Sequence, residues 1–525
     1  MSPNPIRTSI ALAIGLSLAS QPAAGSDGAG SAASWQAARR PHANLEVNLA
    51  NGNLLLQLVT SGYLFGGLEP APAIQLSLNS LSAGQPGDFT AGWDLGPGWS
   101  STLGEKLEFP TAASALLTLA DGTEVAFTDN AGTWVPAAGY YLDLESDGSG
   151  WIVRDRSQMV RRFDASGDLT ALESASGNAY TIQRTAGEAT SVVDPSGRGA
   201  SFTLDATGRL ETMTDSGGQT WYFDYDAAGR LDHVDDPEYG TIDLTYDVDG
   251  RLATFSDLDD NTWSFDYVDG GAWDGRIETI TDPAGLTEEF DYVAGPITDR
   301  TLFTDTRGET WRYFFDREAS PGLKRIKNPL GKKWHFARGV DRLLDSMTDP
   351  LGETWSYTYD AEGRVLSHSD PVGHGAKHTY DTLGNLLTTT VDGKVTAYTY
   401  GDPLHPTRVT KIEEPKAPGA AVPTTTLTWH GPTDGPVPGR WSGLLATVTD
   451  AEGGESRYTY DDVGILSMVE EGPIGATGGI QVRYDLASHP VFTDLGGMGV
   501  PANFPTLPGL DVDMGCFVKI LRLQA

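Results

Sequence analysis

The sequence contains a single cysteine, Cys516, among 525 residues. One thiol cannot form an internal disulfide framework, so stability must come from burial and strand pairing. Basic residues are also scarce, because 36 Lys and Arg stand against 71 Asp and Glu and give a formal net charge of −35. Such a chain repels a phosphate backbone, which argues against nucleic acid as a partner.

Long hydrophobic runs are missing too, apart from one short run near the N-terminus. Arg7 precedes the apolar stretch Ile10 to Ala19, which small residues follow at Ala23 to Gly25. This order is typical of a secretory signal peptide, and the run is too short to span a bilayer. We therefore expect cleavage near Ala23 to Ser26 and a secreted or envelope-located protein without stable membrane insertion.

The familiar catalytic motifs are absent as well. We find no GxSxG, no HExxH, no paired CxxC and no phosphate-cradling glycine loop. His368, His374 and His378 are the best metal candidate, but they read as turn residues between two strands. The sequence therefore predicts no enzyme, no cofactor and no metal site.

Two acidic patterns imitate functional sites. Asp143, Glu145 and Asp147 resemble the start of a calcium loop, yet Arg154 occupies the position that needs a bidentate Glu. The pair Asp259 and Asp260 could serve a glycosidase, but two such carboxylates need a cleft that the sequence does not indicate. Turn chemistry explains both patterns.

What the chain does have is turns, with 63 Gly and 31 Pro. A motif of an aromatic residue or Leu, Asp, two variable residues, Gly, a variable residue and Leu or Val recurs along the sequence. The steps from Leu204 to Tyr225 and from Tyr225 to Tyr246 are both 21 residues. The copies begin at Phe163, Leu204, Tyr225, Tyr246, Tyr359, Tyr380 and Tyr460.

A second turn motif, of the DPxG kind, alternates with the first. Tryptophans stand six residues after several of these turns, as Trp355 does after Asp349. The turns begin at Asp194, Asp215, Asp236, Asp257, Asp282, Asp305, Asn328, Asp349 and Asp370. The tryptophans at the shared offset are Trp221, Trp263, Trp311, Trp334 and Trp355.

One repeat can be read from Asp349 to Ser369. The turn DPLG is followed by TWSYTY, in which aromatic and hydroxyl side chains alternate as in a half-buried strand. DAEG then reverses the chain into a second strand. A lone hairpin of this size is marginal in water, so the units must pair edge to edge in one continuous sheet.

These turns carry a family resemblance. YDAAGRL, YDVDGRL, YDAEGRV and YDTLGNL, joined to DPLGETW and TDPAG, resemble the YD repeats of the RHS family from roughly Arg154 to Leu466. NLANGNLLL at Asn48 to Leu56 and GPGWS at Gly96 to Ser100 are similar to the β-rich region that opens many such proteins. The resemblance implies an all-β fold whose hairpins form an extended, spiralling β-sheet shell, which in the family commonly encloses a C-terminal toxin.

The residues that carry the resemblance are structural rather than catalytic. The turn residues are Tyr225, Asp226, Gly229, Arg230, Tyr246, Asp247, Gly250, Arg251, Tyr359, Asp360, Gly363, Arg364, Tyr380, Asp381 and Gly384.

Composition predicts the domain boundaries. We expect a signal peptide over residues 1–25, a linker over 26–40, a β-rich region over 41–153 and the repeat array over 154–492. A proline-rich interruption over 413–440 predicts a surface loop or joint. After Leu466 the repeats decay, and the atypical tail over 493–525 predicts a truncated or frame-shifted form without the family's closing motif.

Several interpretations remain open at the level of sequence. The leading function is a shell or scaffold for a toxin or other protein cargo in bacterial toxin delivery or contact-dependent competition. The alternative is an adhesin that binds cell-surface glycans, and a glycoside hydrolase is third. Pairs of hairpins could also close into a propeller, although tryptophans in consecutive units favour an open or spiralling sheet.

The turn assignment makes a prediction about stability. Gly363 is fifth in its YD turn, where the geometry calls for a positive φ, so Gly363→Val should cost about 1 to 3 kcal/mol. The cost should stay local, since coupling fades along a repeat array. Replacing the neighbouring Glu362 with Val should cost little. Denaturant unfolding of both variants checks this, and two equally mild effects would contradict the turn.

Overall fold

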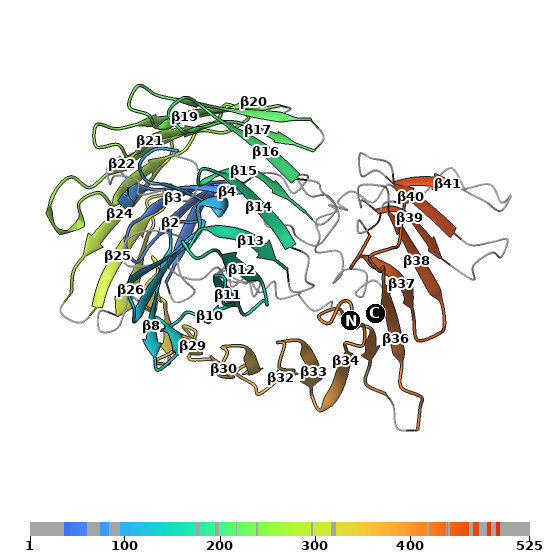
Figure 1. Cartoon of the computed structure of the whole chain (residues 1–525). Helices are drawn as coiled ribbons and strands as arrows, with labels where there is room; N and C mark the ends of the chain where they lie inside the picture. Colours follow the sequence, from blue (N-terminus) through green and yellow to red (C-terminus); the bar gives the residue numbers. More distant parts are fainter. Residues whose placement is uncertain are drawn as a thin grey trace.

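The computed structural model describes residues 36–493 of the chain (Figure 1). The gaps in this description are 60–73, 83–94, 175–178, 195–198, 217, 238–239, 296–297, 317–321, 417–418, 437, 439–440, 461–465, 472–479 and 485–489. The predicted signal peptide and the tail beyond Thr493 lie outside the described residues, as does most of the predicted linker.

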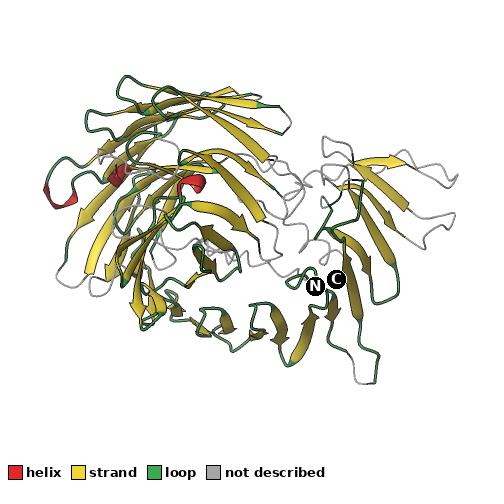
Figure 2. Ribbon diagram, in the orientation of Figure 1, coloured by secondary structure: helices red, strands yellow, loops and turns green. Residues whose placement is uncertain are grey.

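Strands make up nearly all of the regular structure, with a few single 3₁₀ turns (Figure 2). The N-terminal region forms two small antiparallel sheets in chain order. The first contains β1 (Ala38–His42), β2 (Leu45–Asn48), β3 (Leu54–Val59), β4 (Gln75–Asn79) and β5 (Trp99–Ser101). The second contains β6 (Lys106–Thr111), β7 (Ser114–Thr118), β8 (Glu124–Asn130) and β9 (Thr133–Pro136). The 3₁₀ turns are η2 (Ser80–Ser82), η3 (Thr102–Gly104) and η4 (Gly271–Trp273).

The rest of the chain is one antiparallel sheet of 32 strands in strict sequence order. Its first part is β10 (Leu142–Ser146), β11 (Trp151–Asp155), β12 (Val160–Phe163), β13 (Leu169–Glu173), β14 (Ala179–Thr185), β15 (Glu188–Val193), β16 (Gly199–Leu204), β17 (Leu210–Asp215), β18 (Thr220–Tyr225), β19 (Leu231–Asp236) and β20 (Gly240–Tyr246). The middle is β21 (Leu252–Ser256), β22 (Thr262–Tyr267), β23 (Ile277–Thr281), β24 (Thr287–Val293), β25 (Thr298–Thr304), β26 (Thr310–Asp316), β27 (Leu323–Lys327), β28 (Lys333–Arg338), β29 (Leu344–Thr348) and β30 (Thr354–Tyr359). The last part is β31 (Val365–Ser369), β32 (Gly375–Tyr380), β33 (Leu386–Val391), β34 (Lys394–Thr399), β35 (Lys411–Glu413), β36 (Thr424–Trp429), β37 (Leu445–Thr449), β38 (Glu455–Tyr460), β39 (Leu466–Glu471), β40 (Ile480–Tyr484) and β41 (Pro490–Thr493).

This sheet confirms the predicted fold. Each hairpin pairs with the next, and the sheet curls around the N-terminal strands as an open coil (Figure 1). The described strands β10 to β41 form one continuous sheet rather than separate four-stranded blades, so the alternative of a closed propeller is wrong. The sheet begins at Leu142, ahead of the position 154 at which composition predicts the start of the array.

The YD turn is fixed by its own side chains, as the turn at Asp226 shows. The carboxylate Oδ1 of Asp226 accepts hydrogen bonds from the backbone of Ala228 at 2.8 Å and of Arg230 at 3.0 Å. Its Oδ2 accepts a hydrogen bond from Arg230 Nε at 2.7 Å. Burial alone would raise the pKa of Asp226, but these hydrogen bonds hold it below the ordinary value. Gly229 has φ of 82°, which suits glycine.

The same turn also grips the next unit. The Cζ of Arg230 lies 4.6 Å from the ring centroid of Tyr246, the tyrosine of the following YD motif. The hydroxyl of Tyr246 donates a hydrogen bond to the backbone oxygen of Leu231. Two interactions therefore join this unit to the one before it. One is the cation–π contact between the arginine and the tyrosine ring, and the other is the hydrogen bond from the tyrosine hydroxyl to the backbone carbonyl.

The hydroxyl contact repeats along the array, mostly with a separation of 15 residues, and with a separation of 14 from Tyr400 to Leu386. The hydroxyl donates to the carbonyl in the pairs Tyr225 to Leu210, Tyr267 to Leu252, Tyr292 to Ile277, Tyr359 to Leu344, Tyr380 to Val365 and Tyr460 to Leu445. Arginines cover the next ring in the pairs Arg209 to Tyr225, Arg251 to Tyr267 and Arg364 to Tyr380.

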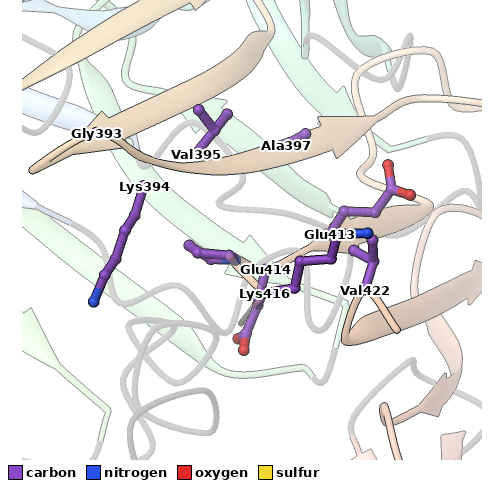
Figure 3. A pocket seen from close by; sticks show the side chains of 9 residues that line it. Gly393, Lys394, Val395, Ala397, Glu413, Glu414, Lys416 and Val422 are labelled. Atoms are coloured by element: carbon purple, nitrogen blue, oxygen red, sulfur yellow. The ribbon is translucent and has the colours of Figure 1, made fainter. Parts of the chain in front are cut away.

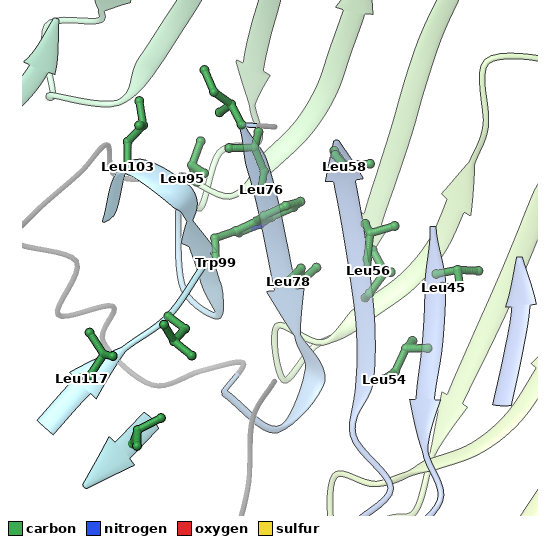
Figure 4. Packing of buried hydrophobic residues seen from close by; sticks show 14 of the residues in the cluster. Leu45, Leu54, Leu56, Leu58, Leu76, Leu78, Leu95, Trp99, Leu103 and Leu117 are labelled. Carbon is green, nitrogen blue, oxygen red and sulfur yellow. The ribbon is translucent and has the colours of Figure 1, made fainter. Parts of the chain in front are cut away.

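The N-terminal sheets lie inside the coil, and their buried leucines form one core with the inner face of the array (Figure 4). Polar contacts join the two regions at many points along the chain. They include Lys106 with Asp168, Arg184 with the Leu103 oxygen, Leu231 N with the Leu95 oxygen, Ile277 N with the Gly52 oxygen, Arg39 with Glu288 and Thr301 with the Leu49 oxygen.

The coil also meets itself after one turn. Arg156 Nη1, at the start of the array, donates to the Gly363 oxygen at 2.8 Å, and the Tyr141 hydroxyl donates to the Asp341 oxygen at 3.2 Å. A Cβ on Gly363 would stand 2.7 Å from the Tyr141 ring, besides the strain of its φ of 75°. The repeat pattern predicts that the cost of Gly363→Val stays within neighbouring hairpins. The contact with Tyr141 instead extends this cost to the start of the array.

The proline-rich interruption differs from its prediction as a loop. Residues Thr424–Trp429 form β36, which pairs with β35 on one side and β37 on the other. The run TTTLTW has the alternation of a strand, while the prolines are confined to the connections on either side. The array therefore continues through this segment.

Removal of the tyrosine hydroxyl tests the contact between units. The Tyr246 hydroxyl donates to the Leu231 oxygen and accepts from Trp99 Nε1 at 3.2 Å, so Tyr246→Phe leaves two buried groups unpaired. We expect a loss of about 1 to 3 kcal/mol in the free energy of unfolding. Tyr222→Phe is the matched control, because Tyr222 is 52% exposed on the outer face. Equal melting temperatures for the two variants would refute the role of the hydroxyl.

Candidate functional site: the inner face of the coil

The inner face is apolar where the N-terminal region covers it. Inward side chains from β12 to β29, ending at Leu344, belong to one buried cluster with that region. Trp263 is 8% exposed and stacks on Phe255, while Trp221, Trp311 and Trp334 are partly buried against the cluster. Each of these tryptophans therefore points inward, and Trp311 offers no free ring to a sugar.

A buried ion pair joins the N-terminal region to the array within the covered part. Arg161 Nε donates to Glu105 Oε2 at 2.8 Å, and the Glu105 side chain is 3% exposed. Burial raises the pKa of Glu105, and the charge of Arg161 opposes that rise. Since both groups are paired, the arrangement is that of a structural contact rather than of a general acid.

Beyond Leu344 the inner face loses its cover. Among the described hydrophobic residues from β30 to β34, only Ala376 is buried. Trp355, Tyr357 and Tyr398 are half-buried on the inward side of this stretch. A second, smaller core then forms around Ile412, Leu427, Leu445 and Tyr458. The coil therefore carries an inward stretch with few buried side chains between the first cluster, which Tyr357 contacts, and the second cluster, which Tyr398 contacts.

Two of the three predicted metal-candidate histidines meet on this stretch. The rings of His368 and His378 stack with centroids 5.9 Å apart, and His378 Nδ1 lies 3.2 Å from Thr389 Oγ1. His374 instead sits in the turn, 74% exposed and near Asp370. No group of three potential metal ligands occurs in the described part of the chain.

The acidic patterns lie only partly in turns, because Asp143 and Glu145 belong to strand β10 and pair with β11, which corrects the expectation of turn chemistry for these two. Asp147 Oδ1 accepts hydrogen bonds from the backbone of Ser149 and Gly150, which closes the turn between β10 and β11. Asp259 and Asp260 lie in the turn capped by Asp257, where Asp260 has φ of 61°. Neither arrangement places two carboxylates across a cleft.

One polar cluster escaped the sequence reasoning. His405 Nδ1 lies 2.8 Å from Asp402 Oδ2 and its Nε2 lies 3.3 Å from Ser442 Oγ. This is the order of groups in a serine hydrolase triad. His405 is only 3% exposed, however, and its contacts tie two connections of the array together. We therefore interpret the cluster as a structural link. The sequence did not predict it, because His405 and Ser442 are 37 residues apart and leave no local pattern.

A shallow cavity lies at the proline-rich connection, away from this cluster (Figure 3). Its volume is about 420 Å³, and Lys394, Val395, Glu413, Glu414 and Lys416 are among its lining residues. The lining mixes both charges without a convergent set of polar groups, so it does not indicate a defined ligand.

Two segments of the array match a family model. Residues 185–220 and 339–374 each match the family model described as RHS Repeat. The chain carries RHS repeats. Each matched segment contains both kinds of turn, and the second includes the YD turn at Asp360. No curated protein sequence matches the chain.

Solved structures also resemble the chain at low identity. The crystal structure of TcdB2-TccC3-Cdc42 is 13% identical with a TM-score of 0.33, and the match covers 86% of this chain and 31% of that one. The crystal structure of TcdB2-TccC3 is 12% identical with a TM-score of 0.33, covering 82% and 28%. The Photorhabdus luminescens Tc holotoxin pore with a TccC3 mutation is 11% identical with a TM-score of 0.23, covering 80% and 30%. The RHS-repeat chain thus matches less than a third of each of these.

No helix in the described residues is both long and apolar enough to cross a membrane.

The histidine pair predicts a pH dependence of stability. The pKa of His378 is lowered from 6.5, by burial first and by repulsion from His368 second. A histidine with a lowered folded pKa gains a proton on unfolding, so its contribution is complete above about pH 6.5 and declines as the pH falls.

We expect His378→Gln to flatten the loss of melting temperature between about pH 7.5 and about pH 5.5. The exposed His374 provides the control, and His374→Gln should leave the slope of the wild-type chain unchanged. Identical slopes in all three proteins would contradict the prediction.

Proposed function

We propose that this chain is a non-catalytic, secreted wall of a hollow RHS-repeat shell that encloses a protein cargo, with a bacterial toxin as the class of cargo. The proposal includes a place in toxin delivery or contact-dependent competition between bacteria. The observation that carries it is the uncovered inner face from β30 to β34.

The character of that face suits an unfolded or partly folded polypeptide. Trp355 and Tyr357 offer aromatic contact area, while His378 and Thr389 add polar groups among them. A mixed surface of this kind binds many sequences weakly, which a container for varied cargo requires. The covered part of the coil, by contrast, has no room for a guest because the N-terminal sheets occupy it.

Protection of a guest from protease tests the proposal. We would fuse an unstructured, protease-sensitive polypeptide after Ala525 of the full chain and follow its digestion. The enclosed guest should be cut at least tenfold more slowly than the same guest mixed with the chain but not fused to it.

The alternation of the strand supplies matched variants. Trp355→Asp with Tyr357→Asp changes the inner face, whereas Ser356→Asp with Thr358→Asp adds the same charge to the outer face of the same strand. Only the inner pair should weaken protection, and melting curves establish that both variants fold. Equal digestion of the fused and the unfused guest would reject the shell function.

A further inference from the structure

The outer face of strands β25 to β28 carries an unusual concentration of positive charge for a chain of net charge −35. One row across these strands joins Arg300, Phe314 and Arg325, and a second joins Arg312, Lys327 and Lys333. Since adjacent strands lie about 4.8 Å apart, each row of three residues is about 10 Å long. These five cations form what we call the basic strip.

The basic strip is not explained by the fold. Arg325 lies over the Phe314 ring, with its Cζ 3.8 Å from the centroid, but none of the five cations forms an ion pair with a described residue. Like charges face each other in Arg312 with Lys327 and Lys327 with Lys333. Such cross-strand pairs are destabilising. In the next unit, 21 residues later, the positions of Lys327 and Lys333 hold Thr348 and Thr354, whose hydroxyls are hydrogen-bonded at 2.9 Å. A pair of threonines at these positions is therefore compatible with the same strand pairing, so the sheet does not require the two lysines.

An acidic strip adjoins it on the same face. Asp266 on β22 and Glu289 and Asp291 on β24 are exposed, and no described residue forms an ion pair with any of the three. Leu302 and Thr304 on β25 lie opposite Asp291 and Glu289 and separate the two strips. The outer face is thus bipolar, with Leu302 and Thr304 between the carboxylates and the cations, while Arg300 stands further along β25, opposite Val293.

We infer that this bipolar face binds a second copy of the chain. A two-fold axis along β25 would set the acidic strip of each copy on the basic strip of the other, with Leu302 against Leu302 at the centre. A surface that carries both halves of a complementary pair is suited to such an isologous contact. In this contact, the carboxylates of the second copy also form ion pairs with the cations of the basic strip, which have no such partners among the described residues of their own chain.

Other occupants fit the face less well. A linear polyanion or an anionic membrane would be attracted to the basic strip but repelled by Asp266, Glu289 and Asp291 beside it, and by the net charge of the chain. The seven strands from β22 to β28 offer a footprint of about 30 Å by about 20 Å, or about 600 Å² per copy. This is below the roughly 800 Å² of a standard interface, so we expect a weak dimer that depends on salt.

Sedimentation of the full chain at low and high ionic strength tests the inference. The wild-type chain should dimerise at low ionic strength and dissociate as salt is added. The triple variant Arg312→Glu, Lys327→Glu, Lys333→Glu makes the face uniformly acidic and should weaken dimerisation at least tenfold. The triple variant Asp266→Lys, Glu289→Lys, Asp291→Lys makes it uniformly basic and should do the same.

Mixing the two variants provides the decisive arm, because an acidic face and a basic face should form a heterodimer more stable than either homodimer. The control carries Lys377→Glu, Lys411→Glu and Arg457→Glu, which add the same charge elsewhere on the outer face. It should dimerise like the wild-type chain, and melting curves verify folding of every variant.

A wild-type chain that stays monomeric at low ionic strength would overturn the inference, and so would a dimer that survives either triple variant. Heparin and phosphatidylserine vesicles are the remaining probes. Their binding to a chain that is monomeric throughout would assign the basic strip to a polyanion or a membrane instead.

Discussion

The array depends on one hydrogen bond that recurs in every regular unit, from a tyrosine hydroxyl to the backbone carbonyl 15 residues earlier. A β-hairpin alone specifies its own two strands but not the position of the next hairpin. The bond adds that information, and in several units the arginine of the preceding turn also covers the ring. Tyr, Asp, Gly, Arg and Leu of the motif thus form one device shared between two units.

The inner face places a second demand on the chain. A sheet with an apolar concave side needs cover, and the N-terminal region supplies it as far as Leu344. The bond between Thr301 and the Leu49 oxygen and the bond between Ile277 and the Gly52 oxygen fix this cover to strands far away in sequence. Where the cover ends, the inward residues change from leucines and phenylalanines to tyrosine, histidine and threonine. The inward side chains are therefore apolar where the N-terminal region covers them and more polar where it does not.

The sequence predicts what local chemistry determines. Gly363 with positive φ, the turn at Asp360 and the alternation of TWSYTY are properties of a few adjacent residues, and the structure has all three. The cover of the inner face and the meeting of Arg156 with Gly363 are contacts between positions from 56 to 252 residues apart, which leave no periodic signal. The same reason explains why proximity of His405 and Ser442 was missed, and why three histidines close in sequence separate into a stacked pair and an exposed turn residue.

The contact of Arg156 and Tyr141 with the turn at Gly363 divides the array into two parts with different freedom to evolve. The strands from β11 to β30 form a closed circumference, since the chain must return to its own start at a set height. Duplication or loss of a unit there would bring a different turn to Arg156 and alter the diameter around the N-terminal sheets. Beyond Gly363, no described strand forms a hydrogen bond with the first strands of the array. Whole units of 21 residues could therefore be gained or lost there without changing the inner diameter of the coil. Variation in the length of such proteins is therefore expected on the open side, where capacity changes while diameter stays constant.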